Sequence, residues 1–107
     1  MDENTWYQEE QANFQVGSAF YNPESKFVRD LGVLAAIVQK QDIGSLRVLD
    51  ALGGCGVRSL RYLQEAEADY VWLNEGNPDH SPIIRKNLAP KNHSDCEASL
   101  GLSLIHI

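Results

Sequence analysis

The sequence contains no hydrophobic run long enough to cross a bilayer, and it does not open with a basic segment followed by an apolar one. A membrane-spanning helix needs about 20 apolar residues, and a secretory leader needs both of those segments. Only two cysteines, Cys55 and Cys96, occur among the 107 residues, too few for a disulfide framework. We therefore expect a protein of the reducing cytoplasm that makes no membrane contact.

Metal ligands and positive charge are also scarce. The three histidines, His80, His93 and His106, are scattered, and none forms a cluster with the cysteines at zinc-site spacing. We therefore expect no metal. Lysine and arginine number 9 against 15 acids, a net charge of −6, which argues mildly against nucleic-acid binding by this piece alone. The length allows one domain at most, or part of one.

What the sequence does contain is the pattern of a strand, a glycine turn, a helix and a second strand. The apolar run of residues 48–52 predicts a strand covered on both faces. Gly53, Gly54 and Gly56 follow, and a loop without side chains lets a ligand lie against backbone N–H groups. Apolar spacing then predicts a helix over 57–66, and residues 70–73 a second strand. This order predicts part of a Rossmann-like α/β domain with a parallel sheet.

Two acids in this unit indicate the class of ligand. Glu75 follows Gly56 by 19 residues, close to the distance of the acid that binds a ribose in nucleotide-binding folds. The dinucleotide-binding motif has glycine or alanine at the position of Ser59 in this chain. In addition, Asp50 would repel a pyrophosphate. S-adenosylmethionine has no phosphate and carries a cationic amino group and a sulfonium. Asp50 thus favours a methyltransferase; a nicotinamide-dependent oxidoreductase and a turn without ligand stay open as alternatives.

The region before the first strand predicts one helix. Residues 1–12 are polar and acidic, and we expect them to be flexible. Asn22-Pro23 marks a turn into an amphipathic helix that runs to about Gln39, with Phe27 and Leu31 on its apolar stripe and Arg29 off it. A non-enzymatic module that binds a partner through this helix is a further alternative.

The sequence resembles the tRNA (guanine-26-N2)-dimethyltransferases over about two-thirds of its length, from Phe20 to Leu88. The motifs that carry the resemblance occur in this order: Phe20-Tyr-Asn-Pro23, Phe27-x-Arg-Asp-Leu31, Val48-Leu-Asp-Ala51, Gly56-Val-Arg58, Arg61-Tyr62, Trp72-Leu-Asn74 and Arg85-Lys-Asn-Leu88. The resemblance implies a class I methyltransferase domain (a helix, then β-α-β-α), with S-adenosylmethionine as cofactor and tRNA as partner. It also implies transfer of one or two methyl groups to the exocyclic amine of a guanine.

The resemblance assigns roles by position. Arg29 would bind the methionine carboxylate, and Glu75 the ribose hydroxyls. Phe20 would stack on the guanine, which an enzyme must first take out of its stack. The remaining cofactor contacts would come from Asp50, Gly54 and Gly56, as a floor under the methionine part, and from Arg58 at the pocket edge.

The chain departs from the family pattern in three places. Gly54-Cys55-Gly56 stands where Ala-Thr-Gly or Ala-Ser-Gly is frequent, and Glu75 where aspartate is common. We expect Cys55 to be a small packing residue. The catalytic Asp-Pro-aromatic-Gly piece of the family is absent. We therefore assign no catalytic residue, and expect the chain to bind cofactor poorly and to methylate nothing by itself.

The last third predicts a helix and little else. Residues 82–90 suit a helix, and the polar residues 92–99 suit a loop. Residues 13–101 would then form a partial, truncated methyltransferase domain. Residues 102–107 resemble the translation of a transposon-end adaptor, and we expect an adaptor-derived tail there; a genuine strand is the alternative.

Overall fold

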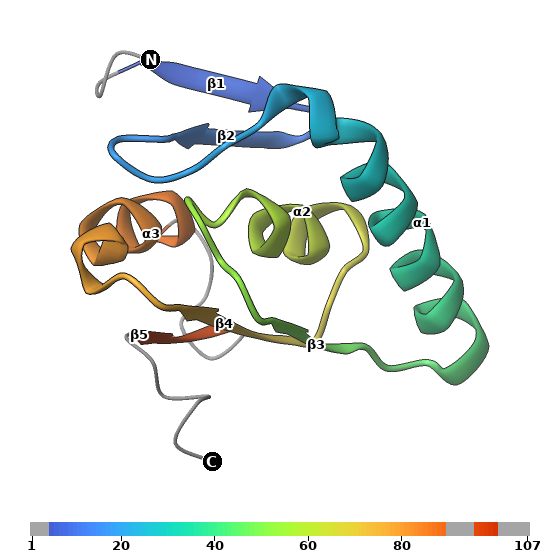
Figure 1. Ribbon diagram of the computed structural model, residues 1–107. Coiled ribbons are helices and arrows are strands. Elements are labelled where there is room, and N and C mark those ends of the chain that lie inside the picture. The colour runs from blue at the N-terminus through green and yellow to red at the C-terminus, as the bar shows by residue number, and fades with distance from the viewer. Residues whose placement is uncertain (1–4, 90–95, 101–107) are drawn as a thin grey trace.

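The computed structural model describes residues 5–89 and 96–100, which are arranged in three layers (Figure 1). A two-stranded hairpin lies on one side, a parallel sheet on the other, and two helices, α2 and α3, between them; the longest helix, α1, flanks the layers. The elements in chain order are β1 (Trp6–Glu9), β2 (Ala12–Gln15), the 3₁₀ turn η1 (Pro23–Ser25), α1 (Lys26–Ile43), β3 (Arg47–Asp50), α2 (Val57–Glu65), β4 (Tyr70–Glu75), the 3₁₀ turn η2 (Pro78–His80), α3 (Ser81–Leu88) and β5 (Cys96–Leu100).

The predicted parallel α/β unit is confirmed. Strand β4 lies between β3 and β5 and pairs with both in parallel, with Val48 opposite Val71 and Leu73 opposite Ala98. Strand β5 (Cys96–Leu100) overlaps residues 92–99, for which the sequence predicts a loop. That prediction was wrong for Cys96 to Ser99 because a strand beside β4 is held by backbone hydrogen bonds, which a polar sequence can make as well as an apolar one.

The N-terminus also differs from the expectation. Residues 6–9 and 12–15 form an antiparallel hairpin, although residues 1–12 had been expected to be flexible; residues 1–4 lie outside the described part of the chain. The hairpin is ordered because Ala12, Phe14 and Val16 point into the core, where each is buried. The ring of Phe14 meets that of Tyr21 edge-on at 4.9 Å between centroids. Burial of these few side chains outweighs the polar character of the segment.

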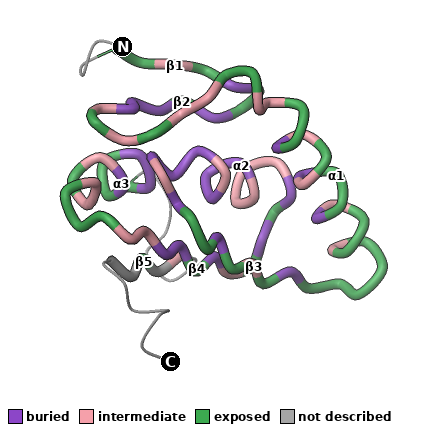
Figure 2. Tube along the Cα trace, in the orientation of Figure 1, coloured by how far each residue is buried: buried purple, intermediate pink, exposed green. Residues whose placement is uncertain are grey.

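The face of helix α1 that packs against the core is not the apolar stripe that the sequence predicts. Its buried residues are Arg29, Val33 and Ala36, whereas Phe27 and Leu31 are exposed (Figure 2). A Cβ atom added to Gly32 would lie 2.9 Å from the hydroxyl oxygen of Tyr62, so α1 and α2 approach closely at that glycine. The close approach and the ion pair of Arg29 with Glu9, described below, decide which face turns inward. The helix also runs four residues beyond Gln39, to Ile43.

Asn87 ties three elements together from the buried side of α3. Its Oδ1 accepts a hydrogen bond from the Gln15 backbone N–H at 2.9 Å, and its Nδ2 donates to the carbonyl oxygens of Gln15 and Cys55 at 2.7 Å each. The side chain is 2% exposed. One amide therefore joins the hairpin and the glycine turn to α3.

We predict that Asn87→Ala lowers the free energy of unfolding by about 3 kcal/mol, because three hydrogen bonds at buried sites are lost together. Urea denaturation followed by circular dichroism measures the change. Asn13→Ala, at an exposed position of β2, is the matched control and should change stability by less than about 0.5 kcal/mol. An equal effect of the two substitutions would contradict the role assigned to Asn87.

Candidate functional site

The glycine turn between β3 and α2 is fixed to the sheet by its backbone. The Gly53 N–H donates to the Asn74 carbonyl on β4 at 2.8 Å, and the Gly56 N–H donates back to the Gly53 carbonyl at 2.8 Å. Gly54 and Gly56 have φ of +56° and +93°, which side chains rarely adopt. A Cβ atom on Gly53 would lie only 2.4 Å from a methyl carbon of Leu73. The turn therefore requires glycine at these three positions.

A cavity of about 180 Å³ lies between this turn and the start of α1. Four residues predicted to form the site line it together: Phe20, Arg29, Gly54 and Arg58. Phe20 is 74% exposed, whereas Arg29 is buried. The other lining residues are Tyr21, Asn22, Ser25, Leu52, Gly53, Cys55 and Val57. The cavity thus has two arginines and an exposed aromatic ring beside a glycine backbone.

Asp50 ends β3 as a buried carboxylate next to this turn. Its Oδ2 accepts a hydrogen bond from the Ser59 hydroxyl at 2.7 Å. Burial raises the pKa of Asp50 above its usual value, although the Ser59 hydrogen bond and the nearby charge of Arg58 act in the opposite direction. In the part of the chain that the structure describes, Asp50 has a hydroxyl partner but makes no ion pair, so its burial costs stability. Such a cost is typical of a residue kept for function.

Glu75 ends β4 beside the same turn, where the sequence predicts a ribose-binding acid. Its Oε1 lies 3.4 Å from the Gly54 backbone nitrogen, and its Oε2 lies 2.5 Å from Nδ1 of His80. The carboxylate is therefore already hydrogen-bonded on both oxygens. In the sequence His80 belongs to no cluster, and the turn η2 (Pro78–His80) is what brings its ring back against Glu75.

Cys55 lies inside the turn as a packing residue. It is 1% exposed and belongs to the core cluster with Leu60, Leu73 and Leu88. Burial raises the pKa of its thiol to about 11, so the thiol is protonated at neutral pH. This position supports the packing role over a nucleophilic one.

The carboxylate of Glu9, which lies in the segment expected to be flexible, binds several polar and charged groups. Glu9 on β1 is 2% exposed and accepts hydrogen bonds from Arg29, Arg61 and the Tyr21 hydroxyl. Burial by itself would raise the pKa of Glu9, but hydrogen bonds from Arg29, Tyr21 and Arg61 lower it overall, so the carboxylate is ionised at neutral pH. The same environment raises the pKa of Tyr21 to about 12. No local sequence pattern marks Glu9, because its partners lie 12 to 52 residues away.

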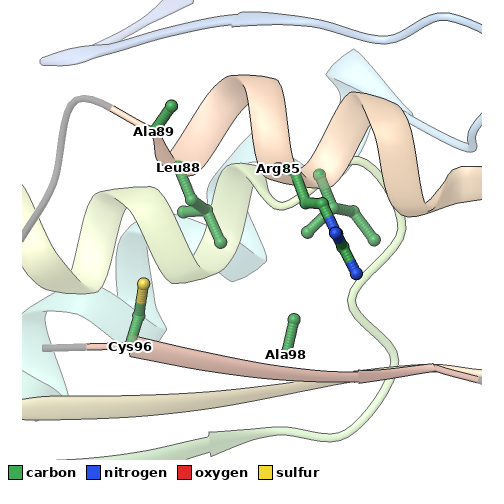
Figure 3. A pocket seen from close by; sticks show the side chains of 6 residues that line it. Arg85, Leu88, Ala89, Cys96 and Ala98 are labelled. Carbon is green, nitrogen blue, oxygen red and sulfur yellow. The ribbon is translucent and has the colours of Figure 1, made fainter. Parts of the chain in front are cut away.

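A second and larger cavity, about 430 Å³, lies between α3 and β5 (Figure 3). It is mainly apolar. Among the described residues its lining includes one charged side chain, that of Arg85; the others are Ile84, Leu88, Ala89, Cys96 and Ala98. None of them belongs to the glycine turn. Within residues 5–89 and 96–100, no group of three potential metal ligands comes together, and no helix is both long and apolar enough to cross a membrane.

Comparison with solved structures identifies the class of fold. The chain superimposes on a Trm1 from Pyrococcus horikoshii in complex with S-adenosyl-L-methionine, with a TM-score of 0.68 and 27% identity over 83% of this chain and 24% of that one. The structure of the M. jannaschii tRNA m1G37 methyltransferase gives a TM-score of 0.73 at 17% identity over 96% of this chain and 30% of that one, a likeness of fold alone. The chain has the Rossmann-like fold of methyltransferase domains.

The family follows from the sequence comparisons. Residues 4–101 match the family described as N2,N2-dimethylguanosine tRNA methyltransferase, and the chain belongs to that family. It is 43% identical over 68 residues to a tRNA (guanine(26)-N(2))-dimethyltransferase of Thermococcus kodakarensis, covering 64% of this chain and 17% of the relative. A Pyrococcus abyssi relative of the same name is 33% identical over 86 residues, covering 80% and 22%. The chain thus spans about a fifth of the length of these relatives.

We predict that Asp50→Asn raises the free energy of unfolding at pH 7, because a neutral amide avoids the cost of a buried charge. The folded pKa of Asp50 is raised, so its destabilising effect appears as the pH rises above the usual value of 3.8 and is absent below it. Urea denaturation at pH 3.5 and pH 7 measures the difference between variant and wild type. Asp42→Asn, at an exposed position, is the control. A variant less stable than wild type at pH 7 would contradict the assignment.

Proposed function

We propose that the glycine-turn cavity binds S-adenosylmethionine, and that the protein carrying this domain methylates the exocyclic N2 amine of a guanine in tRNA. The observation that carries the proposal is the convergence of Arg29, Arg58 and Gly54 on one cavity, with Asp50 and Glu75 at the adjoining strand ends. In open α/β sheets, ligands bind at the carboxyl ends of the strands. The family match and the cofactor-bound relative support the same choice of ligand.

The charges around the turn suit this cofactor. S-adenosylmethionine presents a carboxylate, an ammonium group, a sulfonium and two ribose hydroxyls. Arg29 would bind the carboxylate, and Asp50 would face the cationic part from the end of β3. Glu75 would accept hydrogen bonds from the ribose hydroxyls, in exchange for its present contact with His80. A pyrophosphate placed at the same turn would meet the buried acid Asp50, which argues against a nicotinamide cofactor.

The exposed ring of Phe20 would contact the nucleic acid by stacking on a base. It borders the cavity beside the glycine turn and has free surface for an extruded base to stack on. S-adenosylmethionine bound in the cavity would supply the methyl group: a nitrogen–carbon bond would form as the sulfur–carbon bond breaks, the sulfonium would become a neutral thioether, and the amine proton would pass to solvent. Positioning would supply most of the catalysis. The Asp-Pro-aromatic-Gly piece that would align the amine is absent from this sequence.

We predict that the chain binds S-adenosylmethionine weakly and in preference to NAD, and that Glu75→Ala abolishes this binding because the ribose contact is lost. Titration of ¹⁵N-labelled chain with each ligand, followed through the amides of the glycine turn, measures both affinities. Glu24→Ala removes an exposed acid on η1 and is the matched control, expected to bind like wild type. NAD binding equal to or tighter than that of S-adenosylmethionine would favour the oxidoreductase alternative.

A chimera tests the activity. We predict that the chain alone transfers no methyl group to tRNA, whereas the Thermococcus kodakarensis relative retains transfer when its matching segment is replaced by this one. Incorporation of labelled methyl groups into tRNA, followed by nucleoside analysis for N2-methylated guanosine, measures the product. The same chimera with Glu75→Ala should lose about a hundredfold or more in rate. A folded chimera without transfer, or transfer by the chain alone, would contradict the prediction.

A further inference from the structure

The buried contacts of Glu9 hold the Arg29 guanidinium by one edge. Arg29 Nε donates to Glu9 Oε2 at 2.8 Å, and Arg29 Nη2 donates to Glu9 Oε1 at 2.5 Å. Nη2 also donates to the Asn22 carbonyl oxygen at 3.0 Å. A two-point fork of this kind fixes the plane of the guanidinium, not only its distance from the carboxylate. None of these three bonds uses Nη1.

The second arginine in the cluster does not depend on Glu9 in the same way. Arg61 on α2 contacts Glu9 Oε2 at 3.0 Å, but it also bonds Glu65 at 2.9 Å through both Nε and Nη2 and lies 2.8 Å from Asp30. Arg61 therefore has three carboxylates nearby. The ion pair of Arg29 is with Glu9, and Arg61 also contacts that carboxylate. Arg29 keeps Nη1, which none of the three bonds described above uses, as a donor that a ligand carboxylate could bind.

Arg29 lies where its guanidinium can meet a ligand in the cavity. The residue is 5% exposed and still lines the cavity at the glycine turn. The Tyr21 ring lies 4.8 Å from its guanidinium carbon and also lines the cavity. With the Nε–Nη2 edge bound to Glu9 and a ring beside it, the guanidinium has little freedom to turn.

We propose that Glu9 is a positioning residue for ligand binding: it fixes Arg29 so that the guanidinium can bind the carboxylate of an amino-acid-bearing ligand in the cavity. The inference rests on the proposed function, in which that ligand is S-adenosylmethionine. It gives the N-terminal hairpin a role in recognition, since Glu9 is the last residue of β1. Glu9 touches no ligand itself and acts through Arg29.

Two physical effects of removing the Glu9 charge have opposite signs, and this makes the proposal testable. If only net charge mattered, Glu9→Gln would leave Arg29 less neutralised and would tighten binding of an anionic group. If orientation matters, the same variant loses the two-point fork and weakens that binding. The sign of the change in affinity therefore distinguishes positioning from simple electrostatics.

The experiment compares two ligands that differ in the carboxylate. S-adenosylmethionine carries the amino-acid end, and 5′-methylthioadenosine lacks it while keeping the adenosine and the sulfur. Each is titrated into the ¹⁵N-labelled chain, with shifts followed at the glycine-turn amides. We expect Glu9→Gln to weaken S-adenosylmethionine by about tenfold or more and to leave 5′-methylthioadenosine unchanged within about twofold. Glu10→Gln, at the exposed neighbouring position, is the matched control and should bind both ligands like wild type.

Each other outcome is decisive. Tighter binding of S-adenosylmethionine by Glu9→Gln, or equal weakening of both ligands, overturns the positioning role; the second result would mean that Glu9 only supports the scaffold. If wild type binds neither ligand at millimolar concentration, the proposed cofactor site is refuted, and the role of Glu9 with it. Binding of both ligands by wild type, with no change in the variant, refutes the role of Glu9 alone.

A milder variant covers the case in which Glu9→Gln does not fold. Tyr21→Phe removes only the hydroxyl that donates to Glu9 Oε1 at 2.8 Å and keeps the ring beside Arg29. It should weaken S-adenosylmethionine by about two- to threefold, again without an effect on 5′-methylthioadenosine. Circular dichroism confirms that it folds. Unchanged affinity for both ligands in folded Tyr21→Phe would overturn the proposal.

Discussion

The buried carboxylate of Glu9 is the constraint on which the arrangement of this chain depends. It lies at the end of β1 and accepts hydrogen bonds from Arg29 on α1 and Arg61 on α2, so the charge of one side chain joins the hairpin to both helices. A buried ion pair of this kind need not add stability relative to apolar packing, but it penalises any arrangement that leaves one partner alone. The hairpin and the two helices are therefore held in one orientation, and the cavity at the glycine turn takes its shape from that orientation.

The inverted face of α1 follows from the same constraint. A helix ordinarily buries its apolar stripe, and here Phe27 and Leu31 lie outside while Arg29 lies inside. The charge can be buried because its partner comes from β1, and because Gly32 lets Tyr62 of α2 approach closely. Local hydrophobic pattern and tertiary electrostatics disagree in this helix, and the electrostatics decide.

The glycine turn and the two acids beside it were predictable to a large extent, because they depend on local sequence. The glycines of the turn must adopt positive φ or accept close backbone approach, and such requirements show directly in residue type at Gly53, Gly54 and Gly56. Asp50 and Glu75 end neighbouring parallel strands, and strand order brings such ends together. The pairing of His80 with Glu75 was not predictable, because it depends on the path of the turn η2.

The sequence by itself determined the parallel α/β unit, the glycine turn and the family, since each depends on residues close in the chain or on motifs in a fixed order. Tertiary structure alone decided the rest. The order of the N-terminal hairpin, the strand at Cys96–Leu100 and the inward face of α1 all arise from contacts between residues far apart in the chain. The energy of a buried charge, a strand edge or a close glycine contact depends on its partner. That partner lies in a distant part of the chain, and local sequence patterns do not identify it.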